Sequence, residues 1–446
     1  MNSAAAPAAG PARFTVAPGG TLGGALRVPG DKSISHRALI LGALADGTSE
    51  ISGILDGADC RATAAALGAL GAHIGWPAGG AATVHGPGLA GLQPTAAPLD
   101  LGNSGTGLRL LAGVAAGQPF TTVLTGDASL RRRPMRRIAE PLRQMGATIE
   151  ATPGELAPLR IAGRRPLAGL RYRLPVASAQ LKSALLLAGL FADSDTACQE
   201  PAVTRDHTER LLTQFGADIF RDGAWIGLRA GARLRASAVA VPGDFSSAAF
   251  FIVAATIASG SDLWLEGIGL NPTRTGALDI LRAMGARINI ENPRVAGGEP
   301  VADVRVRSAS LKGIAIPPAL VPLAIDEFPA LMIAAACADG VTTLTGAAEL
   351  RVKESDRIAT LANGLEALGV PVEVAPDGLR VEGIDEFRGA AVHSGGDHRI
   401  AMAFALAALR AKAPVEVLDT ANVATSFPGF AALAAAAGLA IREERP

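Results

Sequence analysis

The stretch VPGDKSISHRALILGAL at residues 28–44 has a close counterpart in VPGDFSSAAFFIVAATIA at residues 241–258. Both begin with Val-Pro-Gly-Asp and continue into a long run of alanine and other apolar residues, which is typical of a buried helix. Because the same start occurs once in each half of the chain, we infer two related halves. Pro29-Gly30 and Pro242-Gly243 would then be paired crossings between the halves, and we expect a double hinge there.

Related sequence units recur six times along the chain. In each unit a polar start leads into an Ala-rich helix, and a second apolar helix ends at a glycine that precedes strand-like sequence. Glycine just after a helix fits a left-handed C-cap. The spacing of roughly 70 residues exceeds the roughly 20–50 residues of most solenoid repeats, so the pattern predicts an α/β fold of six βαβαββ units. The polar starts lie near Asp31, Asn103, Ser178, Asp244, Asp326 and Asp397, and the glycines are Gly71, Gly146, Gly216, Gly285, Gly369 and Gly438.

Composition limits the classes of protein to which the chain can belong. Its 446 residues are too many for a single ordinary core. The 41 Lys and Arg residues balance 41 Asp and Glu residues, and aromatic residues make up only 4%. These values argue against a nucleic-acid-binding protein with a basic surface and base-stacking platforms. The apolar stretch at residues 248–258 is too short to span a membrane as a helix.

Three widely separated cysteines, with no CxxC pair, predict buried inert thiols and a reducing compartment rather than a disulfide framework. No group of His, Cys and carboxylate residues has the spacing of metal ligands, and no GxxxxGKS loop is present. The first residues, MNSAAAPAAGPA, lack the basic start and apolar region of a signal peptide. We expect them to form a short disordered tail.

The starts of the first helices are the best candidates for ligand contact. Free backbone N–H groups and the helix dipole favour an anion at this end of a helix. Six such ends that converge on one cleft would therefore form an anion site, with phosphate as the natural ligand. Most polar residues at these positions also suit an ordinary capping role. Lys32 and Arg399 do not, because a cation opposes the dipole, and a bound anion explains them better.

Two charged stretches add candidates. The segment GDASLRRRPMRR, residues 126–137, contains five arginines. We expect most of them to be solvated and Arg133 to point inward, where it could bind a carboxylate or phosphate bidentately. The segment RVKESDR, residues 351–357, is predicted to lie within one turn of a helix, with Lys353 and Arg357 on the same face. With Glu354, and with Asp326 in the same unit, these residues could provide acid–base chemistry and an anion clamp.

The segment TRDHTER, residues 204–210, reads as the polar first turn of a helix with Thr204 or Asp206 as its cap. A capping or surface role is expected for every member except Arg205, so His207 is predicted to lie on the surface.

Nine motifs follow one another along the chain: PGDKSISHRA, LGNSGTGLR, GDASLRRRPM, SAQLKSALLLAGL, TRDHTE, DEFPAL, LRVKESDR, DHRIAM and TSFPGF. In this order they resemble the EPSP synthase family (3-phosphoshikimate 1-carboxyvinyltransferases), from about residue 15 to the end. The resemblance implies the two-domain enolpyruvyl transferase fold, with three βαβαββ units per domain and helix N-termini facing an interdomain cleft. It also implies that residues 1–29 pack with residues 244–446 in one domain and that residues 30–243 form the other.

The resemblance assigns roles to individual residues. The implied contacts to shikimate 3-phosphate are Lys32, Ser33, Arg37, Ser178, Gln180, Arg205, Asp326 and Lys353. The implied contacts to phosphoenolpyruvate are Lys32, Gly105, Arg133, Gln180, Arg357 and Arg399. The implied catalytic residues are Asp326, which would accept the proton of the attacking hydroxyl, Lys353 beside it, and Glu354, which would handle the methylene proton.

The implied reaction transfers the enolpyruvyl group of phosphoenolpyruvate to the 5-hydroxyl of shikimate 3-phosphate by addition and elimination. This is a step of the shikimate pathway to chorismate and the aromatic amino acids. The resemblance implies no metal and no organic cofactor. The expected protein is a cytoplasmic monomer that acts on small molecules and has no nucleic-acid or membrane partner.

Two alternatives differ from this reading. The enolpyruvyl transferase that acts on UDP-N-acetylglucosamine shares the six-unit architecture, but it typically carries a Cys in a mobile loop, and residues 126–134 contain none. A non-catalytic anion-binding protein is the second alternative. Asp326, Lys353 and Glu354 are titratable groups beside phosphate-binding cations, and they favour an enzyme.

The chain departs at three positions from residues that many family members carry. Ala179 replaces a second serine, His207 replaces a tyrosine and Thr425 replaces a lysine. The family is inhibited by glyphosate, which competes with phosphoenolpyruvate, and alanine at the position of Gly105 is associated with tolerance. Since residue 105 is glycine, we expect a glyphosate-sensitive enzyme.

Overall fold

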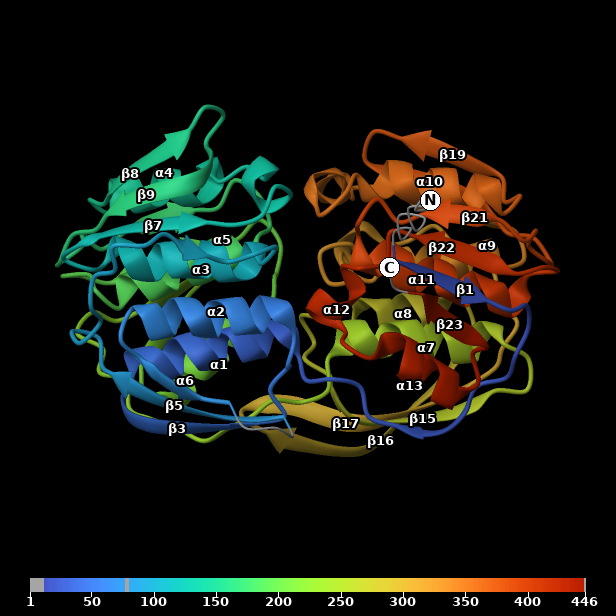
Figure 1. Ribbon diagram of the computed structural model, residues 1–446, viewed down its shortest axis with the longest axis horizontal. Helices are drawn as coiled ribbons and strands as arrows, with labels where there is room; N and C mark the ends of the chain where they lie inside the picture. Colours follow the sequence, from blue (N-terminus) through green and yellow to red (C-terminus); the bar gives the residue numbers. More distant parts are fainter. Residues whose placement is uncertain (1–11, 77–79, 445–446) are drawn as a thin grey trace, which may run out of the picture.

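The computed structural model describes residues 12–76 and 80–444, so residues 1–11 of the expected N-terminal tail lie outside it. Its elements form two lobes side by side (Figure 1). One lobe holds the helices from α1 to α6, and the other holds those from α7 to α13 together with β1. Below, residues 30–243 are called the first half, and residues 12–29 with 244–444 are called the second half.

The first half forms three four-stranded sheets, with strand orders β14-β3-β5-β4, β6-β7-β9-β8 and β10-β11-β13-β12. Its helices are α1 (Lys32–Leu44), α2 (Ala58–Ala69), α3 (Gly105–Ala116), η1 (Leu130–Arg132), α4 (Arg136–Gln144), α5 (Ala179–Gly189) and α6 (His207–Gln214). Its strands are β3 (Asp46–Ser52), β4 (His73–Gly75), β5 (Ala81–Pro87), β6 (Leu99–Asp100), β7 (Thr121–Thr125), β8 (Thr148–Thr152), β9 (Leu156–Ala162), β10 (Arg171–Arg173), β11 (Thr196–Gln199), β12 (Ile219–Asp222), β13 (Trp225–Leu228) and β14 (Val239–Ala240).

The second half forms sheets of strand order β16-β17-β15-β2, β18-β20-β19 and β21-β22-β1-β23. Its helices are α7 (Phe245–Ile257), α8 (Gly276–Ala283), η2 (Pro318–Leu320), α9 (Phe328–Ala336), η3 (Ala348–Val352), α10 (Arg357–Ala367), α11 (His398–Ala407), η4 (Ala408–Arg410), α12 (Val423–Ser426) and α13 (Phe430–Ala437). Its strands are β1 (Arg13–Val16), β2 (Gly23–Leu26), β15 (Asp262–Gly269), β16 (Arg287–Ala296), β17 (Glu299–Arg307), β18 (Val341–Leu344), β19 (Val372–Ala375), β20 (Gly378–Glu382), β21 (Ala391–His393), β22 (Val415–Leu418) and β23 (Ile441–Glu444).

The sheet of residues 99–162 contains the repeating unit without interruption. Along the chain the order is β6, α3, β7, α4, β8 and β9. Strand β6 pairs parallel with β7, and β7 and β8 both pair antiparallel with β9. This sheet has the predicted βαβαββ order.

Three of the sheets are completed by strands from elsewhere in the chain. Strand β2 precedes α1 in sequence but pairs with β15 of the second half, whereas β14 precedes α7 but pairs with β3 of the first half. Strand β1 lies between β22 and β23, so the N-terminal segment completes the last sheet. Units one, four and six are therefore not contiguous in sequence.

The two Pro-Gly stretches lie side by side where the chain passes between the halves. Gly30 and Gly243 form an antiparallel bridge. The bond from Asp31 N–H to Pro242 O mirrors the bond from Asp244 N–H to Pro29 O, and both measure 2.8 Å. Gly30 has no room for a side chain, because a Cβ there would meet Gly53 O at 1.8 Å. Backbones can approach this closely only at glycine. The double hinge at this point stays a prediction.

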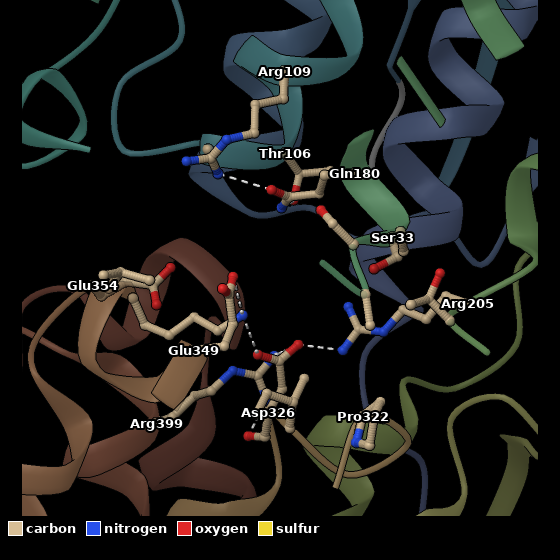
Figure 2. Close-up of a pocket in the computed structure, with 18 of the residues that line it drawn as sticks. Ser33, Thr106, Arg109, Gln180, Arg205, Pro322, Asp326, Glu349, Glu354 and Arg399 are labelled. Atoms are coloured by element: carbon tan, nitrogen blue, oxygen red, sulfur yellow. Dashed lines mark hydrogen bonds and ion pairs between the residues drawn. The ribbon is translucent and has the colours of Figure 1, made fainter. Parts of the chain in front are cut away.

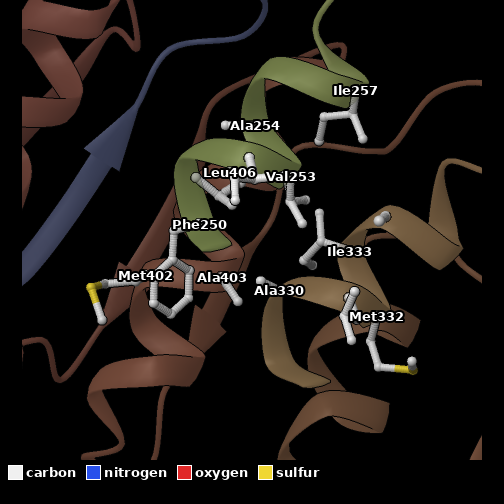
Figure 3. Close-up of a cluster of buried hydrophobic side chains, with 14 of the residues drawn as sticks. Phe250, Val253, Ala254, Ile257, Ala330, Met332, Ile333, Met402, Ala403 and Leu406 are labelled. Atoms are coloured by element: carbon white, nitrogen blue, oxygen red, sulfur yellow. The ribbon is translucent and has the colours of Figure 1, made fainter. Parts of the chain in front are cut away.

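Each half has its own cluster of buried apolar side chains. One cluster runs from Ile34 to Val241, and the other combines Phe14–Val28 with Phe245–Ile441. In the second, α7 is buried on all sides and packs with α9 and α11 (Figure 3). Separate cores are what separate domains require, so we propose domains of residues 12–29 with 244–444 and of residues 30–243; residues 1–11 and 445–446 of the expected domain lie outside the described residues.

All three cysteines are free; Cys60 and Cys198 are buried, and Cys337 is partly buried. Burial raises the pKa of the Cys198 and Cys337 thiols to about 12, which keeps them protonated and unreactive at neutral pH. In the part of the chain that the structure describes, no helix combines the length and the hydropathy that crossing a membrane requires.

Candidate active site

A cavity of about 530 Å³ lies between the two halves, and the first helix of every unit contributes residues from its N-terminal end. All but one of the residues to which the resemblance assigns a substrate contact or a catalytic role line this cavity. They are Lys32, Ser33, Gly105, Arg133, Ser178, Gln180, Arg205, Asp326, Lys353, Glu354, Arg357 and Arg399. Figure 2 shows Arg109, Thr106 and Gln180 on one wall and Glu349, Glu354, Asp326 and Arg399 on the opposite wall.

Arg37 is the exception, because it lies behind the cavity wall. It is buried, and its guanidinium donates to Ser33 O at 2.9 Å, Ser183 Oγ at 2.8 Å and Thr208 Oγ1 at 2.7 Å. In this geometry Arg37 supports the start of α1 and joins it to α5 and α6.

Asp326 lies among four cations at the centre of the cavity. Arg205 of the first half donates to Oδ2, and Arg357 Nη1 lies 3.3 Å from Oδ1. Lys353 Nζ lies 3.8 Å from Oδ1 and Arg399 Nη2 lies 4.0 Å from Oδ2. Burial alone would raise the pKa of Asp326, but these cations outweigh it and hold the pKa well below its usual range. The carboxylate is therefore ionised at neutral pH.

Glu354 bridges two of the predicted phosphoenolpyruvate contacts. Its Oε1 accepts from Arg133 Nη1 at 3.2 Å across the cleft, and its Oε2 accepts from Arg357 Nη2 at 2.7 Å. Burial favours a raised pKa here too, but Arg357 and Arg133 hold the pKa of Glu354 well below its usual range. An anion that takes over these two arginines would release the carboxylate.

Lys353 and Glu354 do not lie in a helix, contrary to the sequence prediction. Helix α10 begins at Arg357, because the Asp356 side chain accepts from Ala359 N–H and so caps the helix there. Lys353 and Glu354 precede it in the connection from η3. Lys353, Glu354 and Arg357 still line one cavity. The prediction that they lie close together is therefore confirmed, but the prediction that one helix holds all three is wrong.

Lys32 and Arg399, which were expected to need an external anion, also have partners within the chain. Lys32 Nζ donates to Asp59 Oδ2 at 3.0 Å and to Ser426 Oγ, from the second half, at 2.6 Å. Arg399 Nη1 donates to Asp326 O at 3.1 Å. The contact of Ser426 also brings the TSFPGF motif against Lys32, which lines the cavity.

The five arginines of residues 131–137 divide much as predicted. Arg131, Arg132 and Arg136 are exposed, whereas Arg133 is buried and donates to Asn103 Oδ1 at 2.5 Å. Arg137, which was expected to be solvated, is half-buried and pairs with Glu349 across the cleft.

His207 is not on the surface, contrary to the prediction. Its side chain is 2% exposed, and Nδ1 lies 2.7 Å from Oε1 of Glu299, which is on β17 of the second half. Glu299 Oε2 also accepts from Asn271. A partner from the other half of the chain makes burial of this polar ring favourable, and no local sequence signal announces such a partner.

Arg109 and Thr106 on α3 also line the cavity, and the sequence reasoning missed both. Arg109 Nη1 donates to Gln180 Oε1 at 2.8 Å, and Gln180 Nε2 donates to Thr106 Oγ1 at 3.1 Å. Burial, with Arg137 and Arg133 nearby, lowers the pKa of Arg109 to about 9. Their spacing could have predicted that Arg109 lines the cavity, because Arg109 lies one helical turn after Gly105 and on the same face of the helix.

Comparison with known proteins identifies this arrangement. A sequence model described as EPSP synthase (3-phosphoshikimate 1-carboxyvinyltransferase) matches residues 16–433. The chain belongs to the EPSP synthase family. This family assignment confirms the resemblance drawn from the motifs and makes the chain an enzyme of the 3-phosphoshikimate 1-carboxyvinyltransferase class. It also favours this reading over the transferase of UDP-N-acetylglucosamine.

Individual relatives within the EPSP synthase family cover nearly the whole chain. The 3-phosphoshikimate 1-carboxyvinyltransferase of Alkalilimnicola ehrlichii is 61% identical, with 96% of both chains covered. That of Halorhodospira halophila is 62% identical, with 97% of this chain and 98% of the relative covered. The structure of EPSP synthase from Acinetobacter baumannii superposes with a TM-score of 0.87 at 50% identity, covering 97% of this chain and 100% of that one.

A more distant structure extends the comparison of the fold alone. The enolpyruvyl transferase NikO from Streptomyces tendae superposes with a TM-score of 0.79 at 21% identity, over 98% of this chain and 100% of that one. The six-unit architecture of EPSP synthases is therefore shared with a protein of much lower sequence similarity.

Proposed function

We propose that the cavity between the halves transfers the enolpyruvyl group of phosphoenolpyruvate to the 5-hydroxyl of shikimate 3-phosphate, giving EPSP and phosphate. The observation that carries the proposal is the position of Asp326, a partly buried, ionised carboxylate surrounded by Arg205, Lys353, Arg357 and Arg399. Two anionic substrates need several fixed cations, and one hydroxyl needs a proton acceptor.

Shikimate 3-phosphate is placed against the first half in this proposal. Ser33, Ser178 and Gln180 lie at the N-termini of α1 and α5, where free N–H groups and the helix dipole favour a phosphate. Lys32 and Arg205 add positive charge, and Arg37 holds Ser33 from behind. The cyclitol then lies with its 5-hydroxyl toward Asp326 and Lys353.

Phosphoenolpyruvate is placed at the end of the cavity lined by Gly105. Arg133 from the first half and Arg357 and Arg399 from the second half bind its phosphate and carboxylate, with Lys32 and Gln180 between the two substrates. Arg and carboxylate or phosphate groups match in a bidentate geometry. This position brings the vinyl carbons beside Glu354. Arg133 and Arg357, which donate to Glu354, would then also bind phosphoenolpyruvate.

The addition step forms a bond from the 5-oxygen to C2 of phosphoenolpyruvate. Asp326 takes the hydroxyl proton, and C3 receives a proton from Glu354, so that a tetrahedral intermediate with its phosphate in place results. Both carboxyl groups are held ionised by cations. When phosphoenolpyruvate neutralises Arg133 and Arg357, burial dominates and raises the pKa of Glu354, so that it can carry this proton.

The elimination step reverses only the proton transfer at C3, and the proton that Asp326 took from the hydroxyl passes to the departing phosphate. Glu354 removes a proton from the new methyl group, the C2=C3 double bond forms again, and the bond from C2 to the bridging oxygen breaks. Phosphate leaves with that oxygen, and Arg133, Arg357 and Lys32 stabilise its charge. Water would hydrolyse or divert the intermediate, which explains a site enclosed between two lobes.

Release of inorganic phosphate from phosphoenolpyruvate tests the proposed function. We expect release that requires shikimate 3-phosphate, and no release with UDP-N-acetylglucosamine as acceptor. Release that depends on UDP-N-acetylglucosamine would favour the other transferase, and no release with either acceptor would favour a protein that only binds anions.

We also propose that the enzyme is a monomer in the cytoplasm. The three free thiols support the cytoplasmic part of this proposal. Sedimentation velocity that gives a larger particle than one chain would contradict the first part.

Replacement of Gly105 should separate glyphosate from phosphoenolpyruvate. A Cβ at residue 105 would lie 3.0 Å from both Arg109 Nη1 and Arg133 Nη1, which are the ends of flexible side chains and can shift slightly. We therefore expect Gly105→Ala to fold and to tighten the phosphoenolpyruvate end of the cavity. A methyl-sized change in a fitted pocket discriminates by about 10-fold or more. The inhibition constant of glyphosate should rise by more than the KM for phosphoenolpyruvate.

The measurement is both constants for the wild type and for Gly105→Ala. Gly68→Ala in α2 serves as the control, because its Cβ would meet nothing within 4 Å. Equal changes in the two constants, or a wild type that already tolerates glyphosate, would mean that the pocket near residue 105 has a different shape when occupied.

A further inference from the structure

Arg137 and Glu349 face each other across the mouth of the cavity. Arg137 lies on α4 of the first half and Glu349 on η3 of the second half, with Arg137 Nη1 donating to Glu349 Oε1 at 3.0 Å. Their side chains are 23% and 31% exposed. The pair joins the two halves at the mouth, away from the Gly30–Gly243 crossing.

The same oxygen of Glu349 also faces a residue of the site. Glu349 Oε1 lies 3.9 Å from Lys353 Nζ, and that ammonium lies 3.8 Å from Asp326 Oδ1. Lys353 is therefore placed between two carboxylates, one at the mouth and one at the centre. A continuous row of alternating charges runs from Arg137 through Glu349 and Lys353 to Asp326.

Positive charge on the first half attracts the Glu349 carboxylate across the cleft. Arg109 and Arg133 lie beside Gly105, and burial together with the guanidiniums of Arg137 and Arg133 lowers the pKa of Arg109. Their cross-cleft partners are Glu349 and Glu354 of the second half. Separation of the halves would leave these like charges uncompensated, so the pairs favour the closed form.

We propose that Glu349 is a positioning residue, whose carboxylate pairs with Arg137 across the cleft and thereby holds Lys353 against Asp326 in the closed enzyme. The inference rests on the proposed function, since Lys353 and Asp326 act there on the 5-hydroxyl. The competing explanation is a surface ion pair without consequence, because such pairs contribute little.

A double-mutant cycle separates these explanations. The variants are Arg137→Gln, Glu349→Gln and both together, measured as kcat/KM for shikimate 3-phosphate. We expect Glu349→Gln to lower it about fivefold, the order of magnitude that one partly exposed pair can contribute. The kcat/KM of the double variant should fall no further than that of the more impaired single variant, because all three variants remove the same Arg137–Glu349 pair.

The pH profile provides a readout that a merely structural role would not move. Burial lowers the pKa of Lys353, while Asp326 and Glu349 raise it. Charged groups that face it are Asp326 before α9, Glu349 on η3, Glu354 beside it and Arg357 on α10, with Arg137 behind Glu349 on α4. Removal of the Glu349 charge disfavours the ammonium form. The alkaline limb of kcat/KM should therefore move to lower pH.

Glu373→Gln is the matched control, because Glu373 forms an exposed pair with Arg380 within the second half. It should keep the wild-type rate and pH profile. An active wild type with variants that change less than twofold, losses that add, or an unmoved alkaline limb would overturn this inference alone. A wild type that does not transfer the enolpyruvyl group would overturn the proposed function, and this inference with it.

Discussion

Replacement of Asp326 by asparagine should lower kcat by about 10²–10⁴-fold, the range typical of a general acid–base group. Asparagine keeps the shape of the side chain but cannot take the hydroxyl proton. The carboxylate is ionised in the site because Arg205, Lys353, Arg399 and Arg357 outweigh the effect of burial on its pKa. Shikimate 3-phosphate should still bind, since its phosphate contacts lie on α1 and α5.

Turnover by phosphate release and affinity by calorimetry test this expectation together. The control is Asp222→Asn, which alters an exposed pair with Arg171 on the outside of the first half. Turnover close to that of the wild type would remove Asp326 from the mechanism. Loss of turnover together with loss of binding would assign Asp326 to binding and not to proton transfer.

Replacement of Arg357 by methionine should destabilise the second half by about 3–5 kcal/mol, the cost of removing one partner from a buried ionic group. Its side chain is 1% exposed. Arg357 Nε donates to Asp397 Oδ2 at 2.7 Å and Nη2 donates to Glu354 Oε2 at 2.7 Å. Methionine would leave these carboxylates and Asp326 buried with less positive charge. Binding of phosphoenolpyruvate should be lost as well.

Urea unfolding monitored by circular dichroism gives the stability, and the binding loss is measured on the folded variant at low temperature. Arg380→Met is the control, because Arg380 is 45% exposed in its pair with Glu373. A loss of stability equal to that of the control, or an unchanged KM for phosphoenolpyruvate, would contradict the role given to Arg357.

Features that are local in sequence were predicted well. Polar starts before Ala-rich helices predicted the capped helix ends, and Asp31, Ser178 and Asp397 do accept backbone N–H groups there. Because equivalent ends of related units converge in the fold, residues far apart in sequence line one cavity. The motifs then assigned roles to eight of the charged residues that line the cavity but to none of Asp59, Arg109, Arg137, Arg274 and Glu349, and Arg37 lies behind the cavity wall.

Features that depend on pairing between the halves could not be predicted. The exchange of β2 and β14 between sheets leaves no mark in the sequence of either strand. His207 and Arg137 were expected on the surface. Their partners, Glu299 and Glu349, lie in the other half of the chain, and the sequence around His207 and Arg137 does not reveal them. Lys353 and Glu354 were assigned to a helix because RVKESDR suits one, but the Asp356 cap competes successfully and starts α10 at Arg357.

The fate of the bridging oxygen of phosphoenolpyruvate tests the central claim most directly. Addition and elimination break the bond between C2 and that oxygen, so ¹⁸O placed there should appear entirely in inorganic phosphate, with EPSP formed from shikimate 3-phosphate. Mass spectrometry of both products measures this. Label retained in the organic product would mean that the oxygen–phosphorus bond is cut, and it would contradict enolpyruvyl transfer in this cavity.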